Sequence, residues 1–403
     1  MSSRVSKLLS AAALAGLATT ANAQLSPNQA NVAAAITTPV GTPTAATVAV
    51  QTSLAGVPTS ALPAAYSQFT PGSYSLLGDL SMQTADFQES VIRRYLRDFR
   101  AGGTGVQGVA GQAAPGERKY GSFLVANGQT GHFDANGDRS RTDYGSQNVI
   151  GGMDLRFGEK SLIGITGGYS NVDARLDPGS RNSRIGNWFG GGYGTLGVGP
   201  LYVDLFGTYG EGKYDLRRSV NFGGNTVTPT DLNYSANTRS RIIVGGATTG
   251  LSFNEFGFEF EPFVGGRYTN VRINGFTDGT DIGALSVGRE KYESVLGTAG
   301  LRIGAAIPLG DGVSLRPEVR GEYRHEFEHY GSRGFDVGFG GGTGGLSTVA
   351  FSPTPLARDY AKAGAGLTLS SAHSPFSIVL DYDGTFARDR TINGLTGGFR
   401  LTF

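Results

Sequence analysis

The sequence lacks cysteine, a large net charge of either sign and any long apolar segment after its N-terminus. The absence of cysteine excludes disulfide support and thiol catalysis. The formal net charge of +1 gives no field suited to nucleic acid. A transmembrane helix needs a run of about 18 apolar residues, and none follows the N-terminus. This does not exclude a membrane, because barrel strands alternate apolar and polar residues and are hidden in hydropathy averages.

Residues 1–23 have the organisation of a secretory signal peptide. Arg4 and Lys7 supply its positive end, and a small apolar stretch follows. Ala21 and Ala23 flank Asn22 as an A-x-A cleavage site, which predicts a mature chain that starts near Gln24. The alternative, a helix that anchors the N-terminus in a membrane, is disfavoured because the apolar run is too short to span a bilayer.

Residues 24–80 are rich in Ala, Thr, Pro, Val, Gln and Ser, and they carry no charge before Asp79. They show no helical period and no convincing alternation. We therefore predict a short low-complexity passenger or linker that is flexible or extended. A small exposed functional segment is the alternative.

A helical stripe follows, and we assign residues 81–103 to a helix. Phe87, Val91, Tyr95 and Phe99 recur every four residues, and Ser81 is placed to cap the start. Four arginines lie in the second half, namely Arg93, Arg94, Arg97 and Arg100. Residues 82–100, about 19 residues at 1.5 Å each, span roughly 28 Å, close to the thickness of a bilayer's hydrocarbon core. A helix with so many charges cannot lie in lipid, but it can lie inside a polar pore. The alternative is an amphipathic helix on a surface.

Residues 118–403 contain twelve candidate strands with one apolar and one polar side. Short turns alternate with long polar, Gly-rich loops, as in outer-membrane barrels. The polar side of residues 313–324 reads Arg316, Glu318, Arg320, Glu322 and Arg324, which we assign to the barrel lumen. The final strand places Phe399, Leu401 and Phe403 on one parity. An apolar C-terminal strand suits the closure of a transmembrane barrel, where no edge stays free.

Several motifs, in this order, resemble the translocator (β-domain) of type V secretion autotransporters. They are Ile150–Asp154 (IGGMD), Trp188–Gly194 (WFGGGYG), Leu380–Gly384 (LDYDG) and Phe399–Phe403 (FRLTF). The resemblance covers about residues 80–403 and implies an all-β, 12-stranded antiparallel transmembrane β-barrel with an N-terminal α-helix in its pore. It also makes the C-terminal Phe399, Leu401 and Phe403 a barrel-assembly signal.

The chain departs from that family in two ways. Only residues 24–80 stand where the family usually carries a large passenger, which is too little for a β-solenoid. Some members cleave themselves at an asparagine within the helix, but residues 82–100 contain none, so we expect no such cleavage.

We expect no catalytic, metal or cofactor site. Asp134, Asn136 and Asp138 have the spacing that opens a calcium loop, but Arg139 and Gly145 replace the required Gly and Glu. No nucleophile elbow is present. Three functions stay open: an outer-membrane translocator and anchor, a porin-like or structural barrel without a passenger, and, least supported, a surface hydrolase. The expected partners are the Sec translocon, periplasmic chaperones, the β-barrel assembly machinery, and outer-membrane lipid with lipopolysaccharide.

Overall fold

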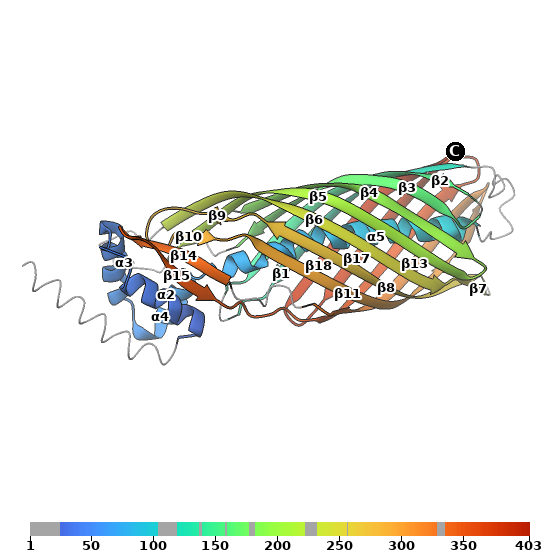
Figure 1. Cartoon of the computed structure of the whole chain (residues 1–403). Coiled ribbons are helices and arrows are strands. Elements are labelled where there is room, and N and C mark those ends of the chain that lie inside the picture. The colour runs from blue at the N-terminus through green and yellow to red at the C-terminus, as the bar shows by residue number, and fades with distance from the viewer. Residues whose placement is uncertain are drawn as a thin grey trace, which may run out of the picture.

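A computed structural model describes residues 25–103, 119–136, 139–157, 159–176, 182–221, 232–255, 257–328 and 335–403. The main body is a closed antiparallel sheet wrapped around one helix, with a smaller cap at one end (Figure 1). Within these ranges no helix is long and apolar enough to cross a bilayer. The predicted signal peptide, with Ala21 and Ala23, lies outside the described residues.

The predicted barrel of twelve strands is confirmed. Its strands are β1 (Tyr120–Phe133), β2 (Thr142–Arg156), β3 (Leu162–Arg175), β4 (Ser183–Val198), β5 (Leu201–Val220), β6 (Leu232–Leu251), β8 (Phe258–Ile273), β11 (Glu290–Ala305), β13 (Val313–Glu326), β16 (Asp359–Ser371), β17 (Phe376–Phe386) and β18 (Arg390–Thr402). The first and last of them pair, from Gly121 opposite Thr402 to Phe133 opposite Arg390. This pairing closes the sheet and leaves no free edge.

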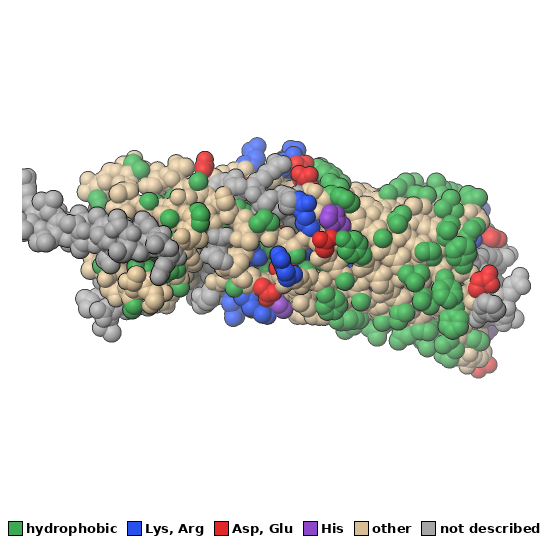
Figure 2. Space-filling model, turned by 90° about the horizontal axis from the view of Figure 1, so that it is seen from below, with side chains coloured by type: hydrophobic (Ala, Val, Ile, Leu, Met, Phe, Trp, Pro, Cys, Tyr) green, Lys and Arg blue, Asp and Glu red, His purple; other side chains and the backbone are tan. Residues whose placement is uncertain are grey.

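Alternation along each strand decides which side chains face outward. In β13, Val319 and Tyr323 are exposed, while Glu322 and Arg324 on either side of Tyr323 are buried. The other strands repeat this order, so hydrophobic side chains form a belt around the outside of the barrel (Figure 2). A charged residue that faced lipid at mid-membrane would cost about 2–4 kcal/mol, so this pattern fixes the register.

The C-terminus completes the seam between β18 and β1. The backbone N–H groups of Tyr120 and Phe403 each donate to the other residue's carbonyl oxygen, at 2.9 and 3.1 Å. The two rings stack with centroids 5.9 Å apart. Phe399 and Phe403 are exposed and Leu401 is half-buried. Their role as a barrel-assembly signal stays a prediction.

Helix α5 (Leu77–Gly103) lies inside the barrel, as predicted, but begins four residues before the expected start at residue 81. Ser81 is therefore not its cap. The Ser81 hydroxyl donates to the Leu77 carbonyl oxygen and also bonds the Tyr214 hydroxyl, both at 2.6 Å. Asp79 in the first turn and Arg100 in the last match the helix dipole.

The expectation of a flexible or extended segment before the helix was wrong. Residues 26–76 fold into α2 (Pro27–Thr37), α3 (Ala45–Ala55), α4 (Leu62–Ser67) and the 3₁₀ turns η1 (Thr59–Ala61) and η2 (Pro71–Leu76). Ser26 and Gln29 form a capping box that starts α2, with Pro27 at its first position. The helical period was obscured because the buried positions of these helices mix polar side chains such as Asn28, Gln29 and Thr47 with small apolar ones such as Ala33 and Ala35.

These helices pack on a second sheet that is built from two loops of the barrel. It contains β9 (Phe276–Thr277), β10 (Leu285–Val287), β14 (Phe335–Gly342) and β15 (Gly345–Phe351), in the order β15-β14-β10-β9. We call residues 25–76 together with this sheet the cap. The opposite end of the barrel carries the C-terminus, tight turns and the short β7 (Phe253–Glu255) and β12 (Ile307–Gly310) (Figure 1).

Close backbone packing between β4 and β5 generates a first prediction. A Cβ atom added at Gly191 would lie 2.0 Å from the carbonyl oxygen of Gly207, whereas one at Gly245 in β6 would meet nothing within 4 Å. We expect Gly191→Ala to destabilise the barrel by about 1–3 kcal/mol, because backbone must move. Gly245→Ala is the matched control. The measurement is the temperature at which the folded band disappears on a semi-native gel, and equal shifts for both variants would contradict the packing.

Candidate functional site: the helix-filled lumen

Helix α5 fills the lumen with two kinds of contact. Its apolar stripe includes Phe87 and Val91, which are buried against barrel side chains such as Phe123 and Phe189. Among the described residues, eleven ion pairs between the helix and the barrel wall lie around this stripe. They are Asp86–Arg267, Asp86–Arg324, Glu89–Arg267, Glu89–Arg324, Arg93–Glu322, Arg94–Asp381, Arg94–Asp383, Arg97–Glu318, Asp98–Arg400, Arg100–Asp204 and Arg100–Glu261.

The acidic half of the helix meets two arginines of the barrel. The Arg267 guanidinium donates to Asp86 at 2.5 Å and to Glu89 at 2.9 Å. Arg324 donates to Asp86 at 3.1 Å, and its Nη1 lies 3.6 Å from Glu89. Both arginine side chains are almost fully buried, so each depends on these carboxylates for charge compensation.

The basic half meets carboxylates. Arg93 lies 3.5 Å from Glu322 and 3.2 Å from Glu89 on its own helix. Arg94 donates to Asp381, Arg97 pairs with Glu318, and Arg100 donates to Asp204. All four of the helix arginines predicted from the sequence are buried in the lumen.

The wall charges therefore mirror the helix charges along the pore. Arginines lie beside the N-terminal, acidic half of α5, and carboxylates lie beside the arginines of its C-terminal half. Asp98 is the acidic residue of that second half, and it meets a wall arginine, Arg400. A shift of one helical turn moves each charge about 5.4 Å and brings like charges together. Ion pairs away from bulk water are stabilising only when each partner is satisfied, so the arrangement selects one register of the helix.

The predicted row on β13 faces the lumen in this structure. Glu318, Arg320, Glu322 and Arg324 are buried, and Arg316 is partly buried and pairs with Glu259. Arg320 does not reach the helix itself but donates to Asp381 at 2.6 and 2.8 Å. It thereby positions the carboxylate that Arg94 uses.

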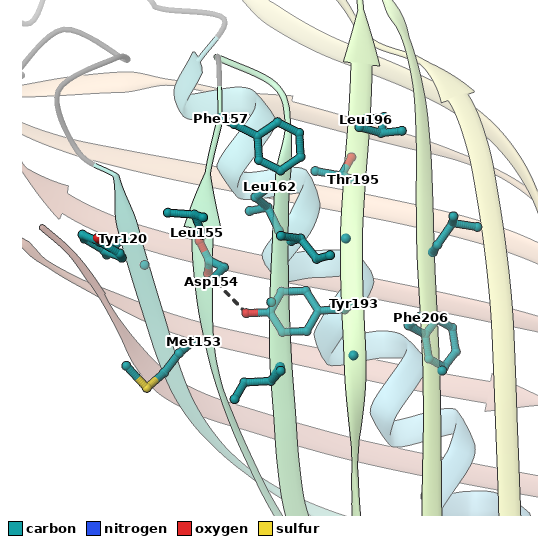
Figure 3. Close-up of a pocket in the computed structure, with 18 of the residues that line it drawn as sticks. Tyr120, Met153, Asp154, Leu155, Phe157, Leu162, Tyr193, Thr195, Leu196 and Phe206 are labelled. Atoms are coloured by element: carbon teal, nitrogen blue, oxygen red, sulfur yellow. Dashed lines mark hydrogen bonds between the residues drawn. The ribbon is translucent and has the colours of Figure 1, made fainter.

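Several residues of this site were not singled out from the sequence. Arg267, Asp381 and Asp383 lie on the polar sides of β8 and β17, and the same alternation that identified β13 also marks them. Asp154 stands between the exposed apolar Met153 and Leu155, so the alternation places it inward as well. It accepts a hydrogen bond from Tyr95 of the helix and another from Tyr193 at 3.2 Å (Figure 3).

A cavity of about 840 Å³ lies at β1–β5, and Tyr193 and Asp154 are among its lining residues (Figure 3). Much of its lining is apolar and belongs to the outer belt, including Met153, Leu155 and Ile163. Such a surface suits hydrocarbon chains rather than polar substrates. Among the described residues no group of three or more His, Cys, Asp or Glu side chains is placed to hold a metal ion.

Comparison with known proteins identifies the architecture. The family model "Autotransporter beta-domain" matches residues 123–383. The translocator domain of the autotransporter NalP from Neisseria meningitidis superimposes with a TM-score of 0.58 at 13% identity, over 81% of this chain and 99% of that domain. The β-domain of the Bordetella autotransporter BrkA superimposes with a TM-score of 0.51 at 18% identity, over 71% of this chain and 100% of that domain.

Two curated relatives, both named "Extracellular serine protease" and both from Serratia marcescens, are 24% identical to this chain. The matches cover 70% and 80% of this chain. The chain spans only 26% and 30% of the length of those relatives. The similarity therefore concerns a limited part of each protease.

The buried ion pairs generate a second prediction. Arg267→Met removes one of the two arginines that pair with Asp86 and Glu89 in the described barrel wall and leaves Arg324, and removing one partner of a buried pair typically costs about 3–5 kcal/mol. We expect a lower urea midpoint for unfolding of the barrel in detergent. Arg184→Met is the control, because Arg184 is exposed and pairs with Asp173 on the outer surface. If the two variants lose equal stability, the lumen pairs do not hold the helix.

Proposed function

The chain belongs to the autotransporter β-domain family, and from this premise we propose that its barrel exports residues 24–76 and then retains them as a folded cap. The barrel is an integral outer-membrane protein that serves as translocator and anchor. The proposal concerns what is exported. Here the N-terminal segment itself is the passenger, and it stays attached through α5.

The contact between the N-terminal segment and the barrel loops carries this proposal. Asn28 and Asn31 of α2 donate to the carbonyl oxygens of Ser352 and Ala350, both at 2.8 Å. Pro43 forms a β-bridge with Gly342, and the Thr44 N–H donates to the Gly341 carbonyl oxygen at 3.2 Å. These partners lie beyond the end of the barrel opposite the C-terminus (Figure 1). Since tight turns face the periplasm in such barrels, the cap faces the cell exterior.

The alternative function, a porin-like barrel without a passenger, is not better supported than a translocator and anchor. Helix α5 occupies the described lumen with an apolar stripe and matched charges, and residues 25–76 continue from it into the cap. An open conduit needs neither feature.

We propose no catalytic activity for this chain. The family describes a transport fold, and the name of the Serratia relatives applies to proteins of which this chain spans under a third. Export needs the Sec translocon, periplasmic chaperones and the β-barrel assembly machinery, and the belt contacts outer-membrane lipid and lipopolysaccharide. No nucleic acid is involved.

Display of the cap is directly testable. Pro58 and Thr59 lie in an exposed turn between α3 and α4, so an epitope inserted between them leaves the helices intact. We expect antibody to label intact cells and the epitope to stay with the cells rather than the medium. An epitope between Asp311 and Gly312, in a tight turn at the opposite end, is the control and should be labelled only after permeabilisation. Protection of both epitopes would refute export.

One buried ion pair joins the cap to the barrel. Arg218 of β5 is fully buried, and its guanidinium donates to Asp278 at 3.0 Å and to the Gln68 carbonyl oxygen at 3.3 Å. The Tyr74 hydroxyl donates to the same Asp278 oxygen at 2.8 Å. Burial raises the pKa of Tyr74 above its ordinary value, so this hydroxyl keeps its proton. Strand β5, the loop after β9 and the N-terminal segment thus share one polar network.

Breaking this network should release the cap without opening the barrel. Arg218→Met leaves the Asp278 carboxylate buried without its cation, at a cost of about 3–5 kcal/mol. We expect faster proteolysis within residues 25–76 of the purified protein, with an unchanged melting transition of the barrel. Arg217→Met is the matched control. Arg217 is next to Arg218 in the sequence, but it faces outward and pairs with Asp215. Equal proteolysis of the two variants would show that the pair does not hold the cap.

A further inference from the structure

Five cationic side chains form a cluster on the outer face of four neighbouring strands at the cap end of the barrel. We call this set the basic sector: Lys213, Arg239, Arg241, Arg272 and Lys291, all of them exposed. The strand register brings them directly opposite one another. Lys213 lies opposite Arg239, Arg241 opposite Arg272, and Arg272 opposite Lys291.

Like charges in directly opposed positions are destabilising, because their Cβ atoms are only about 4.5–5.5 Å apart. Two carboxylates lie nearby but do not neutralise the set. Glu293 pairs with Lys291 at 2.9 Å, and Glu211, opposite Arg241, accepts a hydrogen bond from Tyr209. In the part of the chain that the structure describes, Lys213, Arg239, Arg241 and Arg272 form no salt bridge.

Three cations elsewhere on the same outer rim are paired. Arg141 bonds Asp143 at 3.0 Å, Arg184 bonds Asp173 at 3.1 Å, and Arg217 bonds Asp215 at 3.1 Å. The basic sector differs from these positions because its cations stand opposite one another and, Lys291 apart, not beside a described carboxylate that they bond. An anion from outside the chain would offset the repulsion among the opposed side chains.

The height of the basic sector above the hydrophobic belt indicates where this anion lies. Along β6 the outward positions from Leu251 to Ile243 carry no charge, and Arg241 is the next outward residue. Eight residues of a tilted strand rise roughly 20 Å, close to the height of the apolar band of such barrels. Exposed Tyr209 and Tyr268 lie just below the cations, as aromatic residues do at a membrane interface.

We propose that the basic sector binds the phosphate groups of a glycolipid headgroup in the outer leaflet. Arginine presents a planar fork that holds phosphate oxygens in pairs, and the lysines add point charges. The exposed apolar side chains immediately below take the acyl chains of the same molecule. A lipid is favoured over a free phosphate because the cations follow the edge of the belt across four strands rather than lining a pocket. The proposal does not depend on export of the N-terminal segment.

The test measures lipid binding by the purified full chain in phosphatidylcholine nanodiscs. The probes are bisphosphorylated lipid A and the same lipid A without its phosphates. The variant combines Arg239→Gln, Arg241→Gln and Arg272→Gln. The control combines Arg141→Gln, Arg184→Gln and Arg217→Gln, which removes the same charge from paired positions. Each cation near an anionic lipid surface strengthens binding, so we expect the variant to lose affinity for the bisphosphorylated lipid by about tenfold or more and the control by under about twofold.

The remaining outcomes are decisive in either direction. Weaker binding of dephosphorylated lipid A by the unaltered protein supports phosphate recognition, and equal binding of both lipids overturns it. Competition by inorganic phosphate at low millimolar concentration would assign the site to free phosphate and overturn the lipid. A semi-native gel checks folding of each variant. If the triple Gln variant does not fold, Arg241→Gln alone carries the test, and a triple Lys variant at the same positions should keep most of the binding.

Discussion

The structure depends on one electrostatic constraint: charges that are shielded from bulk water inside a closed sheet must find partners there. Alternation sends one side of every strand into the lumen, so the wall presents Arg267, Glu322 and Asp381 to whatever fills it. Helix α5 supplies the complementary charges in the required order. The charges of the helix and of the wall therefore compensate one another, and either set alone would be left without ion-pair partners. This mutual dependence is what makes the barrel an anchor for the segment attached to the helix.

The N-terminal segment of the cap follows a different rule, because residues 24–78 contain no charged side chain. A segment without charge passes a lumen of alternating charge without forming ion pairs on the way. The next charged residue, Asp79, opens the helix that does pair with the wall. The N-terminal segment consequently supplies no member of an ion pair and is fixed in position by a pair that the rest of the chain provides, Arg218 with Asp278.

Much of this architecture could be predicted from the sequence because its determinants are local. Two-residue alternation predicted the strands and the inward row of β13, and a four-residue step predicted α5 with its arginines. The cap could not be predicted in the same way. Its helices have little contrast in polarity, and they are stabilised by partners about 300 residues away, as Asn28 is by Ser352. The Arg218–Asp278 pair joins two loop-end residues whose proximity no local pattern encodes.

Neighbouring residues of a strand face opposite sides of the barrel, so two adjacent charges can have different roles. Arg217 and Arg218 are neighbours in β5, yet the first lies on the outer rim beside Asp215 and the second is buried under the cap. The same alternation divides the arginines of β8, since Arg267 faces inward and pairs with the helix, while Arg272 faces outward without an ion pair among the described residues. Inside, the chain supplies both members of each pair. On the basic sector it supplies only the cations, so charge balance at that surface has to come from the membrane in which the barrel is embedded.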